Sequence, residues 1–220
     1  MNPKRLLREL PPLVMIGAMF ALSAGVYPLL PGQVPMHWNI HGEIDGYLTK
    51  GPAAVLFIPL LAIGIWLLML LLPKFDRRGD KYKEFTKEFD IIRSVIIGFF
   101  LFLHIIILAA ALGRVSVGRM IPAGVSVLFM LLGAFMGKIR QNSFVGFRLP
   151  WTLADETNWN KTHRVGGRVL VIAGMLSLTG LFFSTMVQYI VLMGAIWSAV
   201  GFTSWYSWRL HQQQKKNIGA

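Results

Sequence analysis

The chain contains no cysteine, so it can form neither disulfides nor sites that depend on a thiolate. Charged residues make up only 15% of the total, and just 10 residues are acidic. The sequence has no phosphate-binding Walker loop, no HExxH metalloprotease motif and no evident nucleophile–base pair. The residues therefore name no reaction, and they favour a protein that is not an enzyme.

The chain is instead rich in apolar residues, which make up 55% of it and give a mean hydropathy of +0.56. They fall in charge-free runs at 10–36, 51–73, 94–113, 120–137 and 169–208. A helix that crosses a bilayer needs about 20 apolar residues. The first four runs each supply one helix, and the last supplies two, with a polar hinge near Ser184, Thr185 and Gln188. We therefore predict an all-α integral membrane protein with six transmembrane helices.

The basic residues are unevenly distributed between the two sides that this layout predicts. With both termini on one side, that side carries 19 of the 22 lysines and arginines. The other side carries only Lys50, Arg114 and Arg119. Cytoplasmic connections attract lysine and arginine, so we predict that both termini are cytoplasmic. The net charge of +12 then reflects membrane orientation, and we predict no direct contact with nucleic acid.

A polar stretch follows the fourth apolar run and reads NSFVGFRLPWTLADETNWNKTHRVGG. Within it, Thr152 and Asp155 have the spacing of a capping box, in which side chains satisfy the first free N–H groups of a helix. Pro150 disfavours helix at the preceding residue. The stretch therefore predicts a short helix over 153–163, placed in a cytoplasmic loop at 138–168.

This stretch resembles the core motif of the SdpI family of bacterial membrane proteins. The pattern is N-x-x-x-G-x-R-x-P-W-T-L followed by W-x-x-T-H-R-x-G-G. The matching residues are Asn142, Gly146, Arg148, Pro150, Trp151, Thr152, Leu153, Trp159, Thr162, His163, Arg164, Gly166 and Gly167. We take ten of them as candidate functional residues: Asn142, Gly146, Arg148, Pro150, Trp151, Trp159, Thr162, His163, Arg164 and Gly167. The two tryptophans are expected to anchor the helix at the membrane interface.

The connection after the first span contains PMHWNIHGEIDGY, which resembles the loop of the small domain that precedes the core in many SdpI-type proteins. Matching residues are Pro35, His37, Trp38, Asn39, Gly42, Asp45 and Tyr47. His37, Trp38, Asn39 and Asp45 are the candidate functional residues here. Asp45 and Gly46 indicate a turn. We predict an N-terminal two-span unit at 1–75, with this loop outside the cell, and an SdpI-like four-span core at 76–220.

The same loop offers two imidazoles and two carboxylates within nine residues: His37, His41, Glu43 and Asp45. Such a cluster could hold zinc. The alternative is a structured cap whose polar groups bind the backbone. We favour the cap and predict no metal and no cofactor.

Three further features bear on the fold. The segment 74–90 mixes charges with Tyr82, Phe85 and Phe89 at helical spacing, which predicts an amphipathic helix on the inner membrane surface or, as an alternative, a docking site for a cytoplasmic protein. His104 is the one ionisable residue well inside a predicted span, and we expect it to bond to a neighbouring helix. Gly133 and Gly137 form a GxxxG helix-packing motif.

The resemblance to the SdpI family implies a function that the residues alone do not. It implies an immunity protein in the bacterial plasma membrane that protects against a secreted, membrane-active peptide toxin. It also implies signalling, in which a cytoplasmic repressor is recruited. Two other functions stay open: a metal-dependent hydrolase that acts on a peptide or lipid at the outer face, and a transporter of small solutes.

Overall fold

The computed structural model describes residues 3–218; residues 1, 2, 219 and 220, which the predicted units 1–75 and 76–220 include, lie outside that range. The elements are α1 (Pro3–Val26), η1 (Tyr27–Leu29), β1 (Gln33–Trp38), β2 (Ile44–Thr49), α2 (Pro52–Phe75), η2 (Gly79–Glu84), α3 (Thr86–Ala111), α4 (Val117–Met136), α5 (Pro150–Ala154), α6 (Glu156–Leu178), η3 (Thr179–Phe182) and α7 (Thr185–Ile218).

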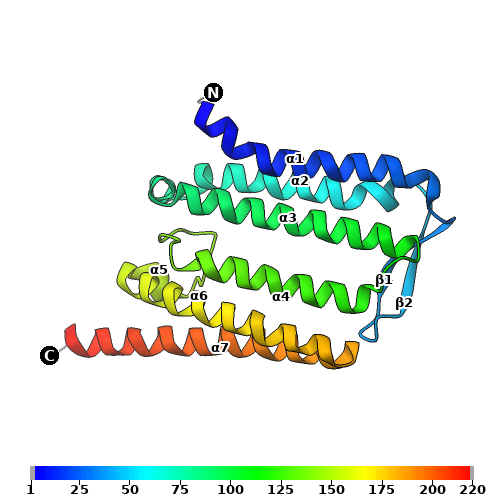
Figure 1. Ribbon diagram of the computed structural model, residues 1–220. Helices are drawn as coiled ribbons and strands as arrows, with labels where there is room; N and C mark the ends of the chain where they lie inside the picture. Colours follow the sequence, from blue (N-terminus) through cyan, green and yellow to red (C-terminus); the bar gives the residue numbers. More distant parts are fainter. Residues whose placement is uncertain (1–2, 219–220) are drawn as a thin grey trace.

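Six of these helices are long and apolar enough to cross a membrane, which confirms the predicted fold class. They are α1, α2, α3, α4, α6 and α7. Figure 1 shows them side by side, with both chain termini at one end of the bundle and the β1–β2 hairpin at the other. We call these the terminus end and the hairpin end.

The helices form two groups that meet where α3 lies beside α4 (Figure 1). In the second group α4 and α6 approach closely because glycines face each other. A Cβ on Gly133 would lie 2.7 Å from the Gly167 carbonyl oxygen, and a Cβ on Gly137 would lie 3.2 Å from the Arg164 Cα. The predicted GxxxG packing of Gly133 and Gly137 is thus confirmed.

The predicted hinge between the last two spans is also confirmed, since α6 ends at Leu178 and α7 begins at Thr185. However, both helices extend beyond the charge-free run at 169–208 from which they were predicted: α6 begins at Glu156 and α7 ends at Ile218. No proline interrupts the sequence between Glu156 and Leu178. Consequently the helix continues through the polar residues that we had placed in a loop.

Residues 33–49 form an antiparallel hairpin, the only strands that the described residues contain. The predicted turn at Asp45 and Gly46 is wrong, because both residues lie in β2 and the chain reverses over 39–43. Asn39 makes this tighter reversal possible. Its side-chain oxygen accepts hydrogen bonds from the backbone N–H groups of His41 and Glu43, and Gly42 adopts a φ of 81°.

The predicted amphipathic surface helix over 74–90 is also wrong. The segment contains the end of α2, the 3-10 helix η2 and the start of α3. Tyr82, Phe85 and Phe89 are buried rather than lying on a membrane surface. They pack against one another, with ring centroids 5.0 to 6.0 Å apart, and against Trp159 and Ile139. Their helical spacing was a signal of core packing.

His104 is buried in α3 and contacts α1, as expected of an imidazole inside a span. Its Nε2 atom lies 3.0 Å from the Ser23 hydroxyl and 3.1 Å from the Met19 carbonyl oxygen. These contacts join the first and third spans, and the Ser23 hydroxyl also lies 2.8 Å from the Val55 carbonyl oxygen of α2.

Candidate functional sites at the two ends of the bundle

Asn142 organises the loop that joins α4 to α5 at the terminus end. It is fully buried. Its side-chain amide donates to the carbonyl oxygens of Arg140 and Val145, at 2.9 and 3.1 Å. Its side-chain oxygen accepts from the N–H groups of Phe144 and Val145 and from the Tyr82 hydroxyl. An asparagine with both ends satisfied fixes the path of the loop.

His163 holds the other side of this loop. The Phe147 N–H donates to His163 Nε2 at 2.9 Å, so Nε2 carries no proton. Nδ1 must then carry it, and it donates to the Trp159 carbonyl oxygen at 2.8 Å. Both hydrogen bonds therefore require a neutral imidazole. The ring also stacks on Trp159, with centroids 3.9 Å apart.

Gly146 lets the loop reach His163. Its φ is 118°, a conformation that other residues rarely adopt. A Cβ at this position would overlap the His163 Nε2 atom. Glycine is therefore required here both for the backbone conformation and for the close approach to the imidazole.

A second hydrogen-bond network ties α5 and α6 to α7. The Trp151 indole donates to the Ser207 hydroxyl at 2.8 Å. Asn158 donates to the Ser207 carbonyl oxygen, and Thr162 lies 2.9 Å from the side chains of both Asn158 and Ser207. Asn158, Thr162 and Ser207 are buried and have partners, which is the condition for polar groups in a core.

The helix predicted over 153–163 differs from what the structure shows. Leu149 is extended, as the following proline requires, and α5 begins at Pro150. Asp155 then caps α6, because its side chain accepts from the Asn158 N–H. Thr152 instead bonds backward, to Phe147 and Leu149. The predicted capping box is wrong because the two residues serve different helices.

The remaining candidates divide between core and surface. Trp159 is fully buried and its indole donates to the Ile139 carbonyl oxygen at 2.8 Å, so its predicted role as an interface anchor is wrong. Trp151 is half-buried. Arg148 and Arg164 are exposed, and no ion pair of either is found among the described residues. Neither arginine pairs with Asp155 or Glu156 in the part of the chain that the structure describes.

The connection between α2 and α3 covers this loop, through contacts that the sequence did not indicate. Asp76 accepts from the Ser143 N–H at 2.8 Å and from the Ser143 hydroxyl at 2.7 Å. Burial raises the pKa of the Asp76 carboxyl, but the hydrogen bonds from Ser143 and Arg78 outweigh it and hold the pKa below its ordinary value. Arg78 also donates to the Leu153 carbonyl oxygen at 2.7 Å.

We call residues 76–85 together with 139–167 the terminus-end cap. Tyr82 lies at its centre. Burial, with the nearby Asp76 carboxylate, raises the pKa of the Tyr82 hydroxyl, so this group keeps its proton and donates to Asn142. Most of the candidate motif residues thus hold one packed unit together, and the exposed arginines are those free to meet another molecule.

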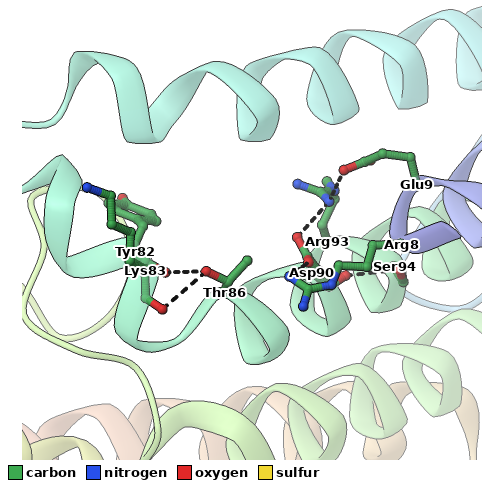
Figure 2. Close-up of polar contacts among 8 residues, drawn as sticks. All are labelled: Arg8, Glu9, Tyr82, Lys83, Thr86, Asp90, Arg93 and Ser94. Atoms are coloured by element: carbon green, nitrogen blue, oxygen red, sulfur yellow. Dashed lines mark hydrogen bonds and ion pairs between the residues drawn. The ribbon is translucent and has the colours of Figure 1, made fainter. Parts of the chain in front are cut away.

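A buried ion cluster beside the cap was also missed. Figure 2 shows the Arg93 guanidinium between two carboxylates, that of Asp90 on its own helix and that of Glu9 on α1. The distances are 2.8 Å to Asp90 and 2.6 Å to Glu9. The Trp66 indole donates to Glu9 at 3.0 Å. The cluster joins α1, α2 and α3 where they reach the terminus end.

At the hairpin end, the polar residues pair with one another. His37 Nδ1 lies 2.5 Å from the Asp45 carboxylate, and Asn39 donates to Glu43 at 2.9 Å. His41 is exposed. Among residues 3–218, no group of three or more His, Asp or Glu side chains is placed to hold a metal ion. Asn39 and the His37–Asp45 pair instead order the hairpin across its two strands.

The hairpin reaches across both helix groups. At its base, Val34 packs with residues of α2 and α3. At its tip, a Cβ on Gly42 would lie 3.0 Å from the Gly118 Cα and 3.4 Å from the Thr185 methyl group. Its surface exposes four large apolar side chains: Ile40, Ile44, Tyr47 and Leu48. Trp38 is half-buried.

Comparison with known proteins matches two parts of the chain to two different family models. Residues 138–207 match the model of the SdpI/YfhL protein family, and residues 14–63 match that of a domain of unknown function (DUF1648). Immunity protein SdpI of Bacillus subtilis (strain 168) is 26% identical over 182 residues, which are 82% of this chain and 84% of that protein. These matches make the chain similar to the SdpI/YfhL family over residues 138–207 and to immunity protein SdpI over most of its length. No solved structure matches it.

With this similarity and six helices able to span a bilayer, the chain is a multi-pass bacterial membrane protein. The DUF1648 match at 14–63 ends within α2, and the SdpI/YfhL match at 138–207 covers the terminus-end loop, α5, α6 and most of α7. The family match at 138–207 contains all ten candidate residues of the core motif.

Proposed function

We propose that the chain is a membrane immunity protein that protects a bacterium against a secreted, membrane-active peptide toxin. The observation that carries this proposal is its similarity to immunity protein SdpI, which extends over 82% of the chain. The proposed cellular orientation follows from the basic residues: the terminus end faces the cytoplasm and the hairpin faces outward.

The hairpin is the part that meets the toxin in this proposal. It exposes Ile40, Ile44, Tyr47 and Leu48 beside the outer ends of the spans. A peptide that enters membranes is itself apolar, and exposed apolar side chains at this level give it a surface on which to bury area. The His37–Asp45 pair keeps the two strands, and thus this surface, in register.

The terminus-end cap supports the second part of the proposal, contact with a cytoplasmic repressor. Arg148 and Arg164 are exposed there, and no ion pair holds either one among the described residues. Guanidinium groups offer planar pairs of donors to a carboxylate. We expect Arg148→Lys to weaken recruitment while leaving protein level unchanged, whereas Lys161→Arg, at an exposed position on α6, should have no effect.

Protection is tested in a toxin-sensitive bacterium that expresses the chain. The readout is the membrane potential, reported by a dye, after a membrane-depolarising peptide is added. We expect the native chain to preserve the potential and Ile44→Asp to lose this protection at equal expression. Thr49→Asp, at an exposed residue at the end of β2, is the matched control and should protect. Failure of the native chain against every such peptide would falsify the proposed function.

Orientation is tested by labelling, which the absence of native cysteine makes direct. Single cysteines at exposed Gln33 and Thr157 should react with a membrane-impermeant maleimide from opposite sides. In intact cells we expect Gln33→Cys to be labelled and Thr157→Cys to be labelled only after lysis. Labelling of both in intact cells would refute this orientation.

A further inference from the structure

A groove runs along the surface of α3 and connects two hollows. The first is a cavity of about 400 Å³ between α3 and α4, lined entirely by these two helices. Gly98, Ala123 and Gly124 are among its lining residues, and the Phe102 ring packs directly over Gly124. Phe99, Phe102 and Leu128 add apolar walls. Figure 1 shows that this is the place where the two helix groups meet.

The second hollow, of about 440 Å³, lies between α1 and α3 nearer the terminus end. Val95 lines both, so the two hollows adjoin. The lining of the second includes three charged residues, Arg8, Lys87 and Asp90, beside the apolar Pro11 and Ile91. The groove is therefore apolar within the span and has charged residues in its lining only where the span ends.

The charge in the second hollow is available to an anion. Asp90 is already bound by Arg93 at 2.8 Å, whereas Arg8 approaches it only to 3.5 Å (Figure 2). The Arg8 side chain remains 47% exposed. Lys87 has no ion pair among the described residues. Three cations at this end of the groove, Arg8, Lys87 and Arg93, thus face two carboxylates, Asp90 and Glu9, which leaves one positive charge for an anion.

The length of the groove matches one leaflet of a bilayer. From Lys87 to Phe102, α3 rises about 22 Å at 1.5 Å per residue. Half of a bilayer, including its headgroups, is about 20 Å thick. We propose that this groove binds one anionic glycerophospholipid, with its phosphate between Arg8 and Lys87 and an acyl chain between α3 and α4. The lipid then fills the space between the two helix groups.

Binding is measured by native mass spectrometry on delipidated protein titrated with phosphatidylglycerol or phosphatidylcholine. We expect phosphatidylglycerol to bind more tightly than phosphatidylcholine. Arg8→Gln with Lys87→Gln should remove this preference, because each cation contributes about fivefold to the affinity for the anionic lipid. Arg8→Lys with Lys87→Arg keeps both charges and should keep the preference. Lys74→Gln with Arg77→Gln, which removes two exposed cations at the same end, should change nothing.

The apolar half of the groove is tested separately. Val127 lines it and is 44% exposed, so Val127→Trp should fill the space and weaken both lipids. Leu68→Trp, at an exposed position on α2, is the control. Glycerol phosphate, which has the headgroup chemistry without the chain, should fail to displace bound lipid. Three results would each overturn the proposal. One is that the native chain binds the two lipids equally, and another is that glycerol phosphate displaces bound lipid. The third is that Arg8→Gln with Lys87→Gln, or Val127→Trp, leaves lipid binding unchanged.

Discussion

The terminus-end cap and the hairpin contain the two sets of motif residues, but they use them in opposite ways. In the cap, Asn142 and His163 are fully buried, and every polar atom of their side chains has a partner. In the hairpin, His37 and Asp45 bond to each other while their side chains are 73% and 43% exposed. A substitution in the cap therefore acts first on folding, whereas one in the hairpin acts first on what the surface can bind.

The largest effect on stability is expected at Gly146. Gly146→Ala forces a side chain into a backbone conformation that costs about 1–3 kcal/mol, and it also displaces the His163 ring. We expect a loss of more than about 3 kcal/mol in the free energy of unfolding, measured by thermal unfolding in detergent. Gly113→Ala is the matched control, because Gly113 also has a positive φ of 69° but nothing within 4 Å of a Cβ. Equal losses at both sites would mean that the contact with His163 contributes nothing.

A smaller effect, with a pH signature, is expected at Asp76. Its pKa is lower in the folded chain, so its stabilising contribution is present above the unfolded pKa of about 3.9 and is lost as pH falls through the folded value. Asp76→Asn should cost about 2 kcal/mol at neutral pH, since hydrogen bonds to charged groups are worth about 1.5–3 kcal/mol. The difference in the free energy of unfolding between the native chain and Asp76→Asn should narrow below pH 4. If this difference in unfolding free energy stays constant down to pH 2, the ionised Asp76 carboxylate does not stabilise the fold in the way proposed.

The smallest effect on stability is expected in the hairpin. Exposed ion pairs contribute about 0–1 kcal/mol, so Asp45→Ala should leave the unfolding temperature almost unchanged. Protection should nevertheless fall, because the strands lose the pair that holds their register. His41→Ala, at an exposed position whose side chain has no partner among the described residues, should protect nearly as well as the native chain. A large drop in unfolding temperature for Asp45→Ala would place the hairpin in the folding core.

The sequence was sufficient for the features that depend on local composition. Apolar runs gave the six spans, polar residues near Ser184 gave the hinge, and the spacing of Gly133 and Gly137 gave a helix contact. From the sequence, Lys87 and Arg8 could be recognised only as two of the basic residues on the predicted cytoplasmic side. Their position along one groove depends on how α1 packs against α3.

What sequence reasoning missed are contacts between distant residues. The Asp76–Ser143 bonds join residues 67 positions apart, and the Arg93–Glu9 pair joins residues 84 apart. Neither contact leaves a pattern among neighbouring residues of the sequence. Charged residues at the ends of the spans therefore indicated only the orientation in the membrane. The same limit explains Phe85, whose helical spacing fits a surface helix and a core equally until its partners are known.

The contrast between the terminus-end cap and the hairpin is tested most directly with one histidine variant from each. Unfolding temperature and protection against the toxin are measured for both variants. His163→Ala removes the acceptor of the Phe147 N–H and the ring stacked on Trp159, so it should lower the unfolding temperature and lose protection only as far as folded protein is lost. His37→Ala should keep the unfolding temperature and lose protection at equal protein level. The opposite pattern, a His37→Ala chain that protects fully or a His163→Ala chain of native stability, would contradict the account.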